Sequence, residues 1–155
     1  LILDINLVGV MNGVSAFAAA MRERGVGHIV NTASLAGLSV PAPGVGAYTM
    51  TKYGVVAISE AARLELAPHG VGVSVLCPGL VGTGLSENTV RIKGGVPQAA
   101  HKMPEGEVTP EQVGDMVVDG IEQNADYIIT HRGAWQAIGK RLEAIRAACA
   151  YREGK

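Results

Sequence analysis

Tyr48 and Lys52 stand four positions apart in a segment with helical periodicity, so their side chains should lie one turn apart on the same helix face. A phenol is a poor acid–base catalyst at neutral pH because its ordinary pKa is near 10. An ammonium group about 4 Å away favours a phenolate by roughly the 4 kcal/mol that a shift to neutrality requires. The pair therefore predicts a tyrosine that exchanges a proton with a substrate oxygen.

The Tyr48–Lys52 spacing alone does not establish catalysis, because a tyrosine packed on its helix beside a solvated lysine would have the same spacing. Two further polar residues are candidates to act with the pair. Ser34 follows an apolar segment, and Asn6 lies near the amino terminus. A catalytic interpretation requires a fold that brings these side chains to Tyr48.

Strands are predicted at three short segments that are rich in β-branched and apolar residues and end near Gly, Pro or Asn. They cover residues 28–33, 71–77 and 126–130. The middle segment is almost entirely apolar, as expected for a parallel strand with both sheet faces covered. Cys77 ends it and is expected to be a buried thiol.

Helices are predicted where apolar residues recur at spacings of three and four. They cover residues 1–23, 45–67 and 134–151, and a fourth helix begins at Thr109. Thr109 and Gln112 have the spacing of a capping box. Residues 84–107 contain several Gly and Pro and predict an irregular segment, with a short helix near residues 86–92. In the first helix the predicted buried stripe comprises Leu3, Leu7, Val10 or Met11, Val14, Phe17 or Ala18, and Met21.

The alternation of strands and helices predicts an α/β fold with a Rossmann-like, doubly wound parallel sheet. The pattern gives about three strands and four main helices, whereas such a fold has two mononucleotide-binding halves of βαβ units of about 30 residues each. We therefore expect residues 1–155 to be the C-terminal part of a single domain whose N-terminal dinucleotide-binding half is absent from this sequence. A self-sufficient three-stranded domain is the alternative.

Four segments resemble, in order, the motifs of the short-chain dehydrogenase/reductase family, and the resemblance covers essentially the whole chain. They are Asp-Ile-Asn-Leu-Val-Gly at residues 4–9, Ile-Val-Asn-Thr-Ala-Ser-Leu-Ala-Gly at residues 29–37, Ala-Tyr-Thr-Met-Thr-Lys at residues 47–52, and Cys-Pro-Gly-Leu-Val-Gly-Thr at residues 77–83.

The resemblance implies a role for each catalytic candidate. Tyr48 would donate a proton to a ketone during reduction and accept it during oxidation of a secondary alcohol. Ser34 would hold the substrate oxygen near Tyr48. Lys52 would bind the nicotinamide ribose and make the phenol a better acid. Asn6 would anchor a water that links Lys52 to solvent; a purely structural role in its helix is the alternative.

The resemblance also implies NAD or NADP as cofactor, with Tyr48 and Lys52 among the residues that bind it. Pro78 and Gly79 would turn the backbone beside the nicotinamide, and Val81 and Thr83 would contact its carboxamide. A plain turn explains Pro78 and Gly79 equally well. The family's Gly-rich phosphate loop is missing from this sequence, so the chain alone is expected to be inactive and the choice between NAD and NADP stays open.

Two other function classes remain open. A sugar-nucleotide epimerase or dehydratase would share the Tyr-x-x-x-Lys helix, although the short region after Thr83 disfavours it. A non-catalytic role, including that of a truncated fragment, is the second. The presence of Ser34, Tyr48 and Lys52 together argues against a degenerate site.

Composition limits the partners. The chain is 48% hydrophobic and 17% charged with a net charge of −1, which disfavours nucleic acid and anionic membranes. The sequence contains no apolar run of about 18 residues, the length that a membrane span needs. The two cysteines lack the spacing of metal ligands, which favours a cytoplasmic, metal-free protein. The family resemblance implies a homodimer or homotetramer, to which three small residues after Lys52 could contribute: Ala57, Ala61 and Ala62. The histidines are expected in solvated turns or loops: His28, His69, His101 and His131.

Overall fold

A computed structural model describes residues 1–83 and 108–153 of the chain. It contains a parallel sheet in the order β1-β2-β3, formed by Gly27–Thr32, Val71–Cys77 and Tyr127–Ile129. Strand β1 pairs with β2 from Gly27↔Val71 to Thr32↔Leu76, and β2 pairs with β3 from Val75 to Cys77. The three predicted strands are confirmed, and the predicted short helix near residues 86–92 lies outside the described residues.

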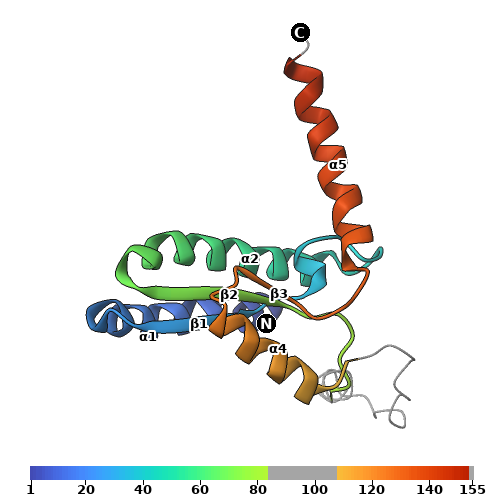
Figure 1. The fold of residues 1–155 in the computed structure, drawn as a ribbon. Helices are drawn as coiled ribbons and strands as arrows, with labels where there is room; N and C mark the ends of the chain where they lie inside the picture. The colour runs from blue at the N-terminus through green and yellow to red at the C-terminus, as the bar shows by residue number, and fades with distance from the viewer. Residues whose placement is uncertain (84–107, 154–155) are drawn as a thin grey trace.

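Helices separate the strands, as predicted. A five-residue π-helical segment, Asp4–Val8, continues into α1 (Gly9–Arg24). Helix α2 (Gly46–Leu66) is followed by a short 3₁₀ turn, Ala67–His69. Helix α4 (Pro110–Glu122) and α5 (Ala134–Glu153) complete the order. Figure 1 shows α2 and α4 on opposite sides of β2 and β3, whereas α5 projects away from the sheet.

The core lies between the sheet and the helix layer formed by α1 and α2. One cluster joins Val55 and Val56 of α2 to Val75 and Cys77 of β2. A second cluster joins the other end of α2, at Ala62 and Leu66, to Val71 and Val73 of β2, as the burial of apolar surface requires. The core thus runs along the whole length of α2 and fixes that helix on the sheet.

The structure shows which residues of the first helix face this core. The packed residues are Leu7, Val10, Val14, Ala18 and Met21. Leu3, Met11 and Phe17 are exposed, Phe17 by 62%. The periodicity allowed either Val10 or Met11, and either Phe17 or Ala18, to be buried. Where α2 crosses the first helix, the smaller residue of each pair packs against the core.

Helix α4 begins as its sequence predicts. The Thr109 hydroxyl accepts a hydrogen bond from the Gln112 backbone N–H at 3.3 Å, and the Gln112 side chain accepts one from the Thr109 N–H at 2.9 Å. This reciprocal pair satisfies two of the N–H groups that a helix start leaves without partners. The helix also packs its buried Gly120 against Ile128 of β3.

Although the sequence has no apolar run of about 18 residues, one helix is long and apolar enough on average to cross a membrane. The helix Asp4–Arg24 is 21 residues long and passes this test of length and composition with a mean hydropathy of 1.3 over an 18-residue window. Its apolar residues alternate with Gly, Ser and Asn, so it contains no continuous apolar run. Such helices also occur in soluble proteins, and here one side of the helix packs on the sheet and α2.

Candidate active site

The predicted site residues gather at the carboxyl edge of the sheet. Ser34 follows β1, Pro78 and Gly79 follow β2, and the start of α2 carries Tyr48 to the region where β1 ends. In a parallel sheet all carboxyl ends face the same edge, which is where α/β folds bind ligands. The topology therefore accounts for the approach of residues that are up to 45 positions apart.

Tyr48 and Lys52 lie on the same side of α2. The Lys52 ammonium is 5.8 Å from the centroid of the Tyr48 ring and donates a hydrogen bond to the backbone carbonyl of Thr32 at 3.0 Å. Burial lowers the pKa of Lys52 below its ordinary value, and the nearby Cys77 thiol opposes this to a smaller degree. The lysine thus carries a positive charge into a half-buried position between the end of β1 and the tyrosine ring.

Ser34 joins the ends of two strands. Its hydroxyl accepts a hydrogen bond from the Ala36 N–H at 3.1 Å and donates to the Pro78 carbonyl at 3.4 Å. The Leu35 N–H donates to the same carbonyl at 2.9 Å. The serine is therefore the N-cap of a short 3₁₀ turn, Leu35–Gly37.

This turn lies directly against α2 because Gly37 has no side chain. A Cβ at Gly37 would lie 2.6 Å from the Lys52 carbonyl oxygen, closer than real Cβ atoms come to backbone. The glycine, which is not strained in its own backbone, allows the two main chains to touch. The segment with Ser34 and the helix with Tyr48 and Lys52 are consequently fixed to each other.

Asn6 lies in the middle of the π-helical segment that precedes α1. Its side-chain amide donates to the Thr51 hydroxyl at 3.2 Å, and that hydroxyl donates to the Tyr48 carbonyl at 2.7 Å. Single π-helical turns inside α-helices are frequent at functional sites. The structure brings Asn6 to the helical turn between Tyr48 and Lys52.

The segment after β2 holds the predicted cofactor-binding residues. Val81 forms an isolated parallel bridge with Val108, and the Gly82 N–H donates to the Val108 carbonyl at 3.3 Å. The Thr83 N–H donates to the Val81 carbonyl at 2.7 Å, and Thr83 is exposed. Backbone hydrogen bonds thus hold this segment beside the residue that precedes the Thr109 cap.

His131 lies in a bend after β3, as expected for a turn or loop residue, but it is half-buried and hydrogen-bonded rather than solvated. The ring follows β3 and contacts the turn after β2, with Nδ1 3.2 Å from the Gly79 nitrogen and Nε2 2.9 Å from the Leu80 oxygen. Its position directly after a parallel strand was the signal that could have revealed it. The same edge rule that places Ser34 and Pro78 applies to the residue that follows β3.

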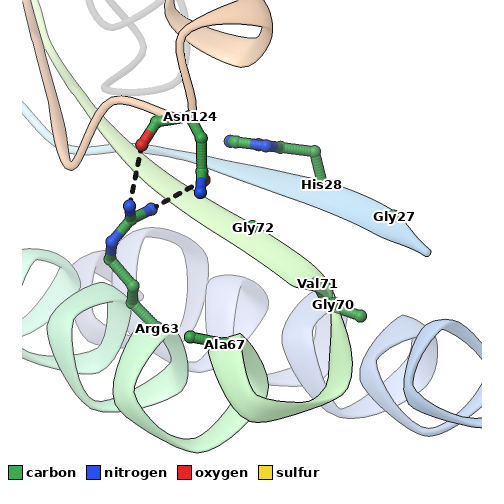
Figure 2. Close-up of a pocket in the computed structure, with 8 residues that line it drawn as sticks. All are labelled: Gly27, His28, Arg63, Ala67, Gly70, Val71, Gly72 and Asn124. Atoms are coloured by element: carbon green, nitrogen blue, oxygen red, sulfur yellow. Dashed lines mark hydrogen bonds between the residues drawn. The ribbon is translucent and has the colours of Figure 1, made fainter. Parts of the chain in front are cut away.

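His28 was also expected in a solvated turn, but it lies in β1 at the opposite edge of the sheet. Its Nε2 is 2.8 Å from the Ser74 hydroxyl. Nearby, a cavity of about 270 Å³ is lined by His28, Arg63 and Asn124 among others. Figure 2 shows Arg63 reaching from α2 to Asn124, with hydrogen bonds of 3.1 Å to its side chain and 2.7 Å to its backbone carbonyl.

Arg63 makes further bonds there, to the Val73 carbonyl at 2.7 Å and to the Asp126 carboxylate at 2.6 Å. These contacts join α2 to β2 and to the start of β3, so the cavity's polar groups serve to connect elements. Asn31 also connects two elements, since its buried amide donates to the Ser59 hydroxyl at 3.0 Å. No cluster of three or more potential metal ligands occurs among the residues that the structure describes.

Comparison with known proteins supports the architecture. The structure is similar to a short-chain dehydrogenase/reductase from Burkholderia phymatum in complex with NAD, with 30% identity and a TM-score of 0.78 over 93% of this chain and 57% of the other. It is also similar to a short-chain dehydrogenase from Burkholderia cenocepacia in complex with NADP, with 28% identity, a TM-score of 0.71 and coverage of 97% and 56%. The Rossmann-like α/β fold is thereby confirmed.

Sequence comparison leads to the same family. A 3-alpha-(or 20-beta)-hydroxysteroid dehydrogenase of Mycobacterium tuberculosis is 41% identical over 86 residues, which are 56% of this chain and 33% of that protein. The chain therefore spans about a third of the length of this relative. The family model for short chain dehydrogenases matches residues 1–93, a segment that includes Asn6, Ser34, Tyr48 and Lys52. The chain belongs to the short-chain dehydrogenase family.

Proposed function

We propose that the protein containing this chain is an NAD(P)-dependent oxidoreductase that interconverts a secondary alcohol and a ketone. The observation that carries the proposal is the position of the Lys52 ammonium, 5.8 Å from the centre of the Tyr48 ring. An ammonium beside the ring can bind cofactor hydroxyls while the phenol exchanges a proton with the substrate oxygen. Tyr48 then acts as the general acid in reduction and the general base in oxidation.

Ser34 positions the substrate oxygen in this proposal. Its bond to the Pro78 carbonyl is long at 3.4 Å, so the hydroxyl can turn toward a substrate at little cost. Asn6 anchors a water through which Lys52 exchanges a proton with solvent. Its amide is already fixed by Thr51 on the turn between the tyrosine and the lysine.

The described residues fit a nicotinamide dinucleotide at one end. The bond from Lys52 to the Thr32 carbonyl uses one of the three N–H groups of the ammonium, which leaves donors for ribose hydroxyls. The turn at Pro78 and Gly79, with Val81 and Thr83 beyond it, lies at the ligand-binding edge of the sheet. When bound, the nicotinamide supplies or accepts the hydride. The two solved relatives with NAD and NADP support this assignment.

The phosphates of the dinucleotide need a partner outside these residues. No Gly-x-Gly-x-x-Gly sequence occurs in the chain, and the known phosphate loops of this fold follow its first strand. We infer that the chain forms the C-terminal part of a domain whose other half holds the phosphates. The chain alone is therefore expected to be inactive.

The exposed side of the α1–α2 layer supports a homodimer or homotetramer. Phe17 is 62% exposed and Leu64 is 79% exposed, and Ile5 and Met11 add apolar surface on the first helix. Exposed apolar side chains on this layer would suit an interface between copies. Two of the three small residues noted above, Ala57 and Ala61, are exposed, whereas Ala62 is buried in the core. A cytoplasmic location is part of the proposal, in keeping with the free thiols of Cys77 and Cys149.

The test uses the full-length protein with NADH or NADPH and a panel of ketones that includes steroids, because the mycobacterial relative is named for hydroxysteroids. Tyr48→Phe should lower kcat by at least about 10²-fold, because it removes the hydroxyl that exchanges the proton. Tyr53→Phe is the matched control, since Tyr53 lies on the same helix against Arg141. Unchanged turnover in Tyr48→Phe would contradict the mechanism.

A further inference from the structure

His131 makes two hydrogen bonds to the turn that follows β2. Its Nδ1 lies 3.2 Å from the Gly79 nitrogen and its Nε2 lies 2.9 Å from the Leu80 carbonyl oxygen. The ring therefore reaches an N–H and a C=O group of consecutive residues in one turn. It comes from the segment after β3, so it connects two strand ends at the proposed catalytic edge.

These contacts select one form of the ring. The Leu80 carbonyl can only accept, so Nε2 must carry the hydrogen and donate it. Nδ1 is then an acceptor for the Gly79 N–H and for the hydroxyl of Thr130, which lies 2.7 Å away and is only 5% exposed. A neutral imidazole with its hydrogen on Nε2 suits both the Leu80 carbonyl and the Gly79 N–H, which neither an ammonium nor a carboxylate does.

The ring also packs on the face of Gly79. A Cβ at this position would lie 2.8 Å from His131 Nδ1 and 2.9 Å from the adjacent ring carbon. On its other side the turn is held through the Pro78 carbonyl, which accepts from Ser34 and Leu35. The serine segment and His131 Nδ1 thus bind the two ends of the same peptide group, the one that joins Pro78 to Gly79.

We propose that His131 is a positioning residue that holds the Pro78–Leu80 turn in the conformation that receives the nicotinamide end of the cofactor. The inference rests on the proposed function, which places that turn beside the nicotinamide. His131 does not touch the reacting atoms and acts through the backbone of Gly79 and Leu80. The ladder between β2 and β3 ends at Cys77↔Ile129, so the histidine bonds begin where the sheet stops fixing the chain.

The test compares two ligands on the full-length protein. NAD(P)H carries the nicotinamide, whereas ADP-ribose or its 2′-phosphate lacks it. His131→Phe keeps a planar ring on Gly79 but removes both hydrogen bonds, and it should weaken NAD(P)H binding about tenfold. Affinity for ADP-ribose should stay within about twofold, because its contacts lie away from this turn.

His131→Gln retains an acceptor and a donor on one side chain. It should therefore bind NAD(P)H at least about threefold more tightly than His131→Phe does. His69→Phe is the matched control, since His69 is exposed and precedes β2 at the opposite edge of the sheet. It should bind both ligands as the wild type does.

Two results would overturn the inference. One is wild-type affinity of His131→Phe for NAD(P)H. The other is an equal loss for NAD(P)H and ADP-ribose, which would show that the histidine supports the domain as a whole. A wild-type protein that binds neither ligand would instead refute the proposed function, so the two failures are distinguishable.

Discussion

The Asn6 amide and the Thr51 hydroxyl form a hydrogen bond of 3.2 Å between the π-helical start of the first helix and the turn of α2 that separates Tyr48 from Lys52. Thr51 is fully buried, and its hydroxyl donates a hydrogen bond to the Tyr48 carbonyl. The π-helical turn around Asn6 and helix α2 are thereby joined by polar contacts as well as by packing.

A double-mutant cycle on Asn6 and Thr51 measures this connection. Asn6→Ala and Thr51→Val should each destabilise the full-length protein, and the double variant should lose about 1 kcal/mol less than the sum, because a shared hydrogen bond can be removed only once. Urea unfolding followed by circular dichroism gives the free energies. Strict additivity would show that the two residues are energetically independent.

Gly37→Ala should disturb both stability and catalysis. The added methyl group would meet the Lys52 carbonyl oxygen, which is backbone and cannot swing aside, so we expect a loss of about 1–3 kcal/mol and a fall in kcat. Gly13→Ala is the control, because no atom lies within 4 Å of the new Cβ and alanine favours helix by up to about 1 kcal/mol. Thermal unfolding and turnover report the two effects, and a neutral Gly37→Ala would contradict the close contact.

His28 should make stability depend on pH. Burial, and secondly the Arg63 guanidinium, lower the pKa of His28 below its ordinary value of 6.5. The unfolded chain then binds the proton more readily than the folded chain does. The contribution of the neutral His28 ring to the free energy of unfolding is therefore complete above pH 6.5, and it is lost as the pH falls from there toward the lowered pKa. Urea unfolding between about pH 5 and about pH 8 should show this decline in the wild type and a flatter profile in His28→Gln. Parallel profiles would contradict it.

The two cysteines should react at very different rates. Burial raises the pKa of the Cys77 thiol to about 11, and the side chain is 0% exposed, whereas Cys149 is exposed on α5. An aromatic disulfide reagent should modify one thiol per chain in the native protein and the second only in denaturant. Cys149→Ser should remove the fast phase. A fast phase that persists in this variant would show that Cys77 is accessible.

Local signals sufficed to predict several elements. The apolar run that forms β2 matches the structure from Val71 to Cys77, and the Thr109 capping box begins α4 where the spacing places it. Each of these elements is encoded by residues close together in sequence. The association of Ser34, Tyr48 and Lys52 with one sheet edge followed from the order of strands and helices and from the family resemblance.

Features that depend on distant contacts could not be predicted in the same way. The 3₁₀ turn Leu35–Gly37 lies where a glycine meets the backbone of Lys52, and His131 bonds to a turn 51 and 52 positions away. The choice between Val10 and Met11 depends on where α2 crosses the first helix. In each case the partner comes from another element, which periodicity within one segment does not specify.

The sheet order has a practical consequence for handling the protein. Among the described residues, strand β1 pairs with β2 on one side and with no strand on the other. The backbone N–H and C=O groups along that second side of the six-residue strand are therefore open to pairing with another strand. An open strand edge next to apolar helix surface is a template for association between copies. A preparation of these 155 residues should therefore precipitate or form mixed aggregates.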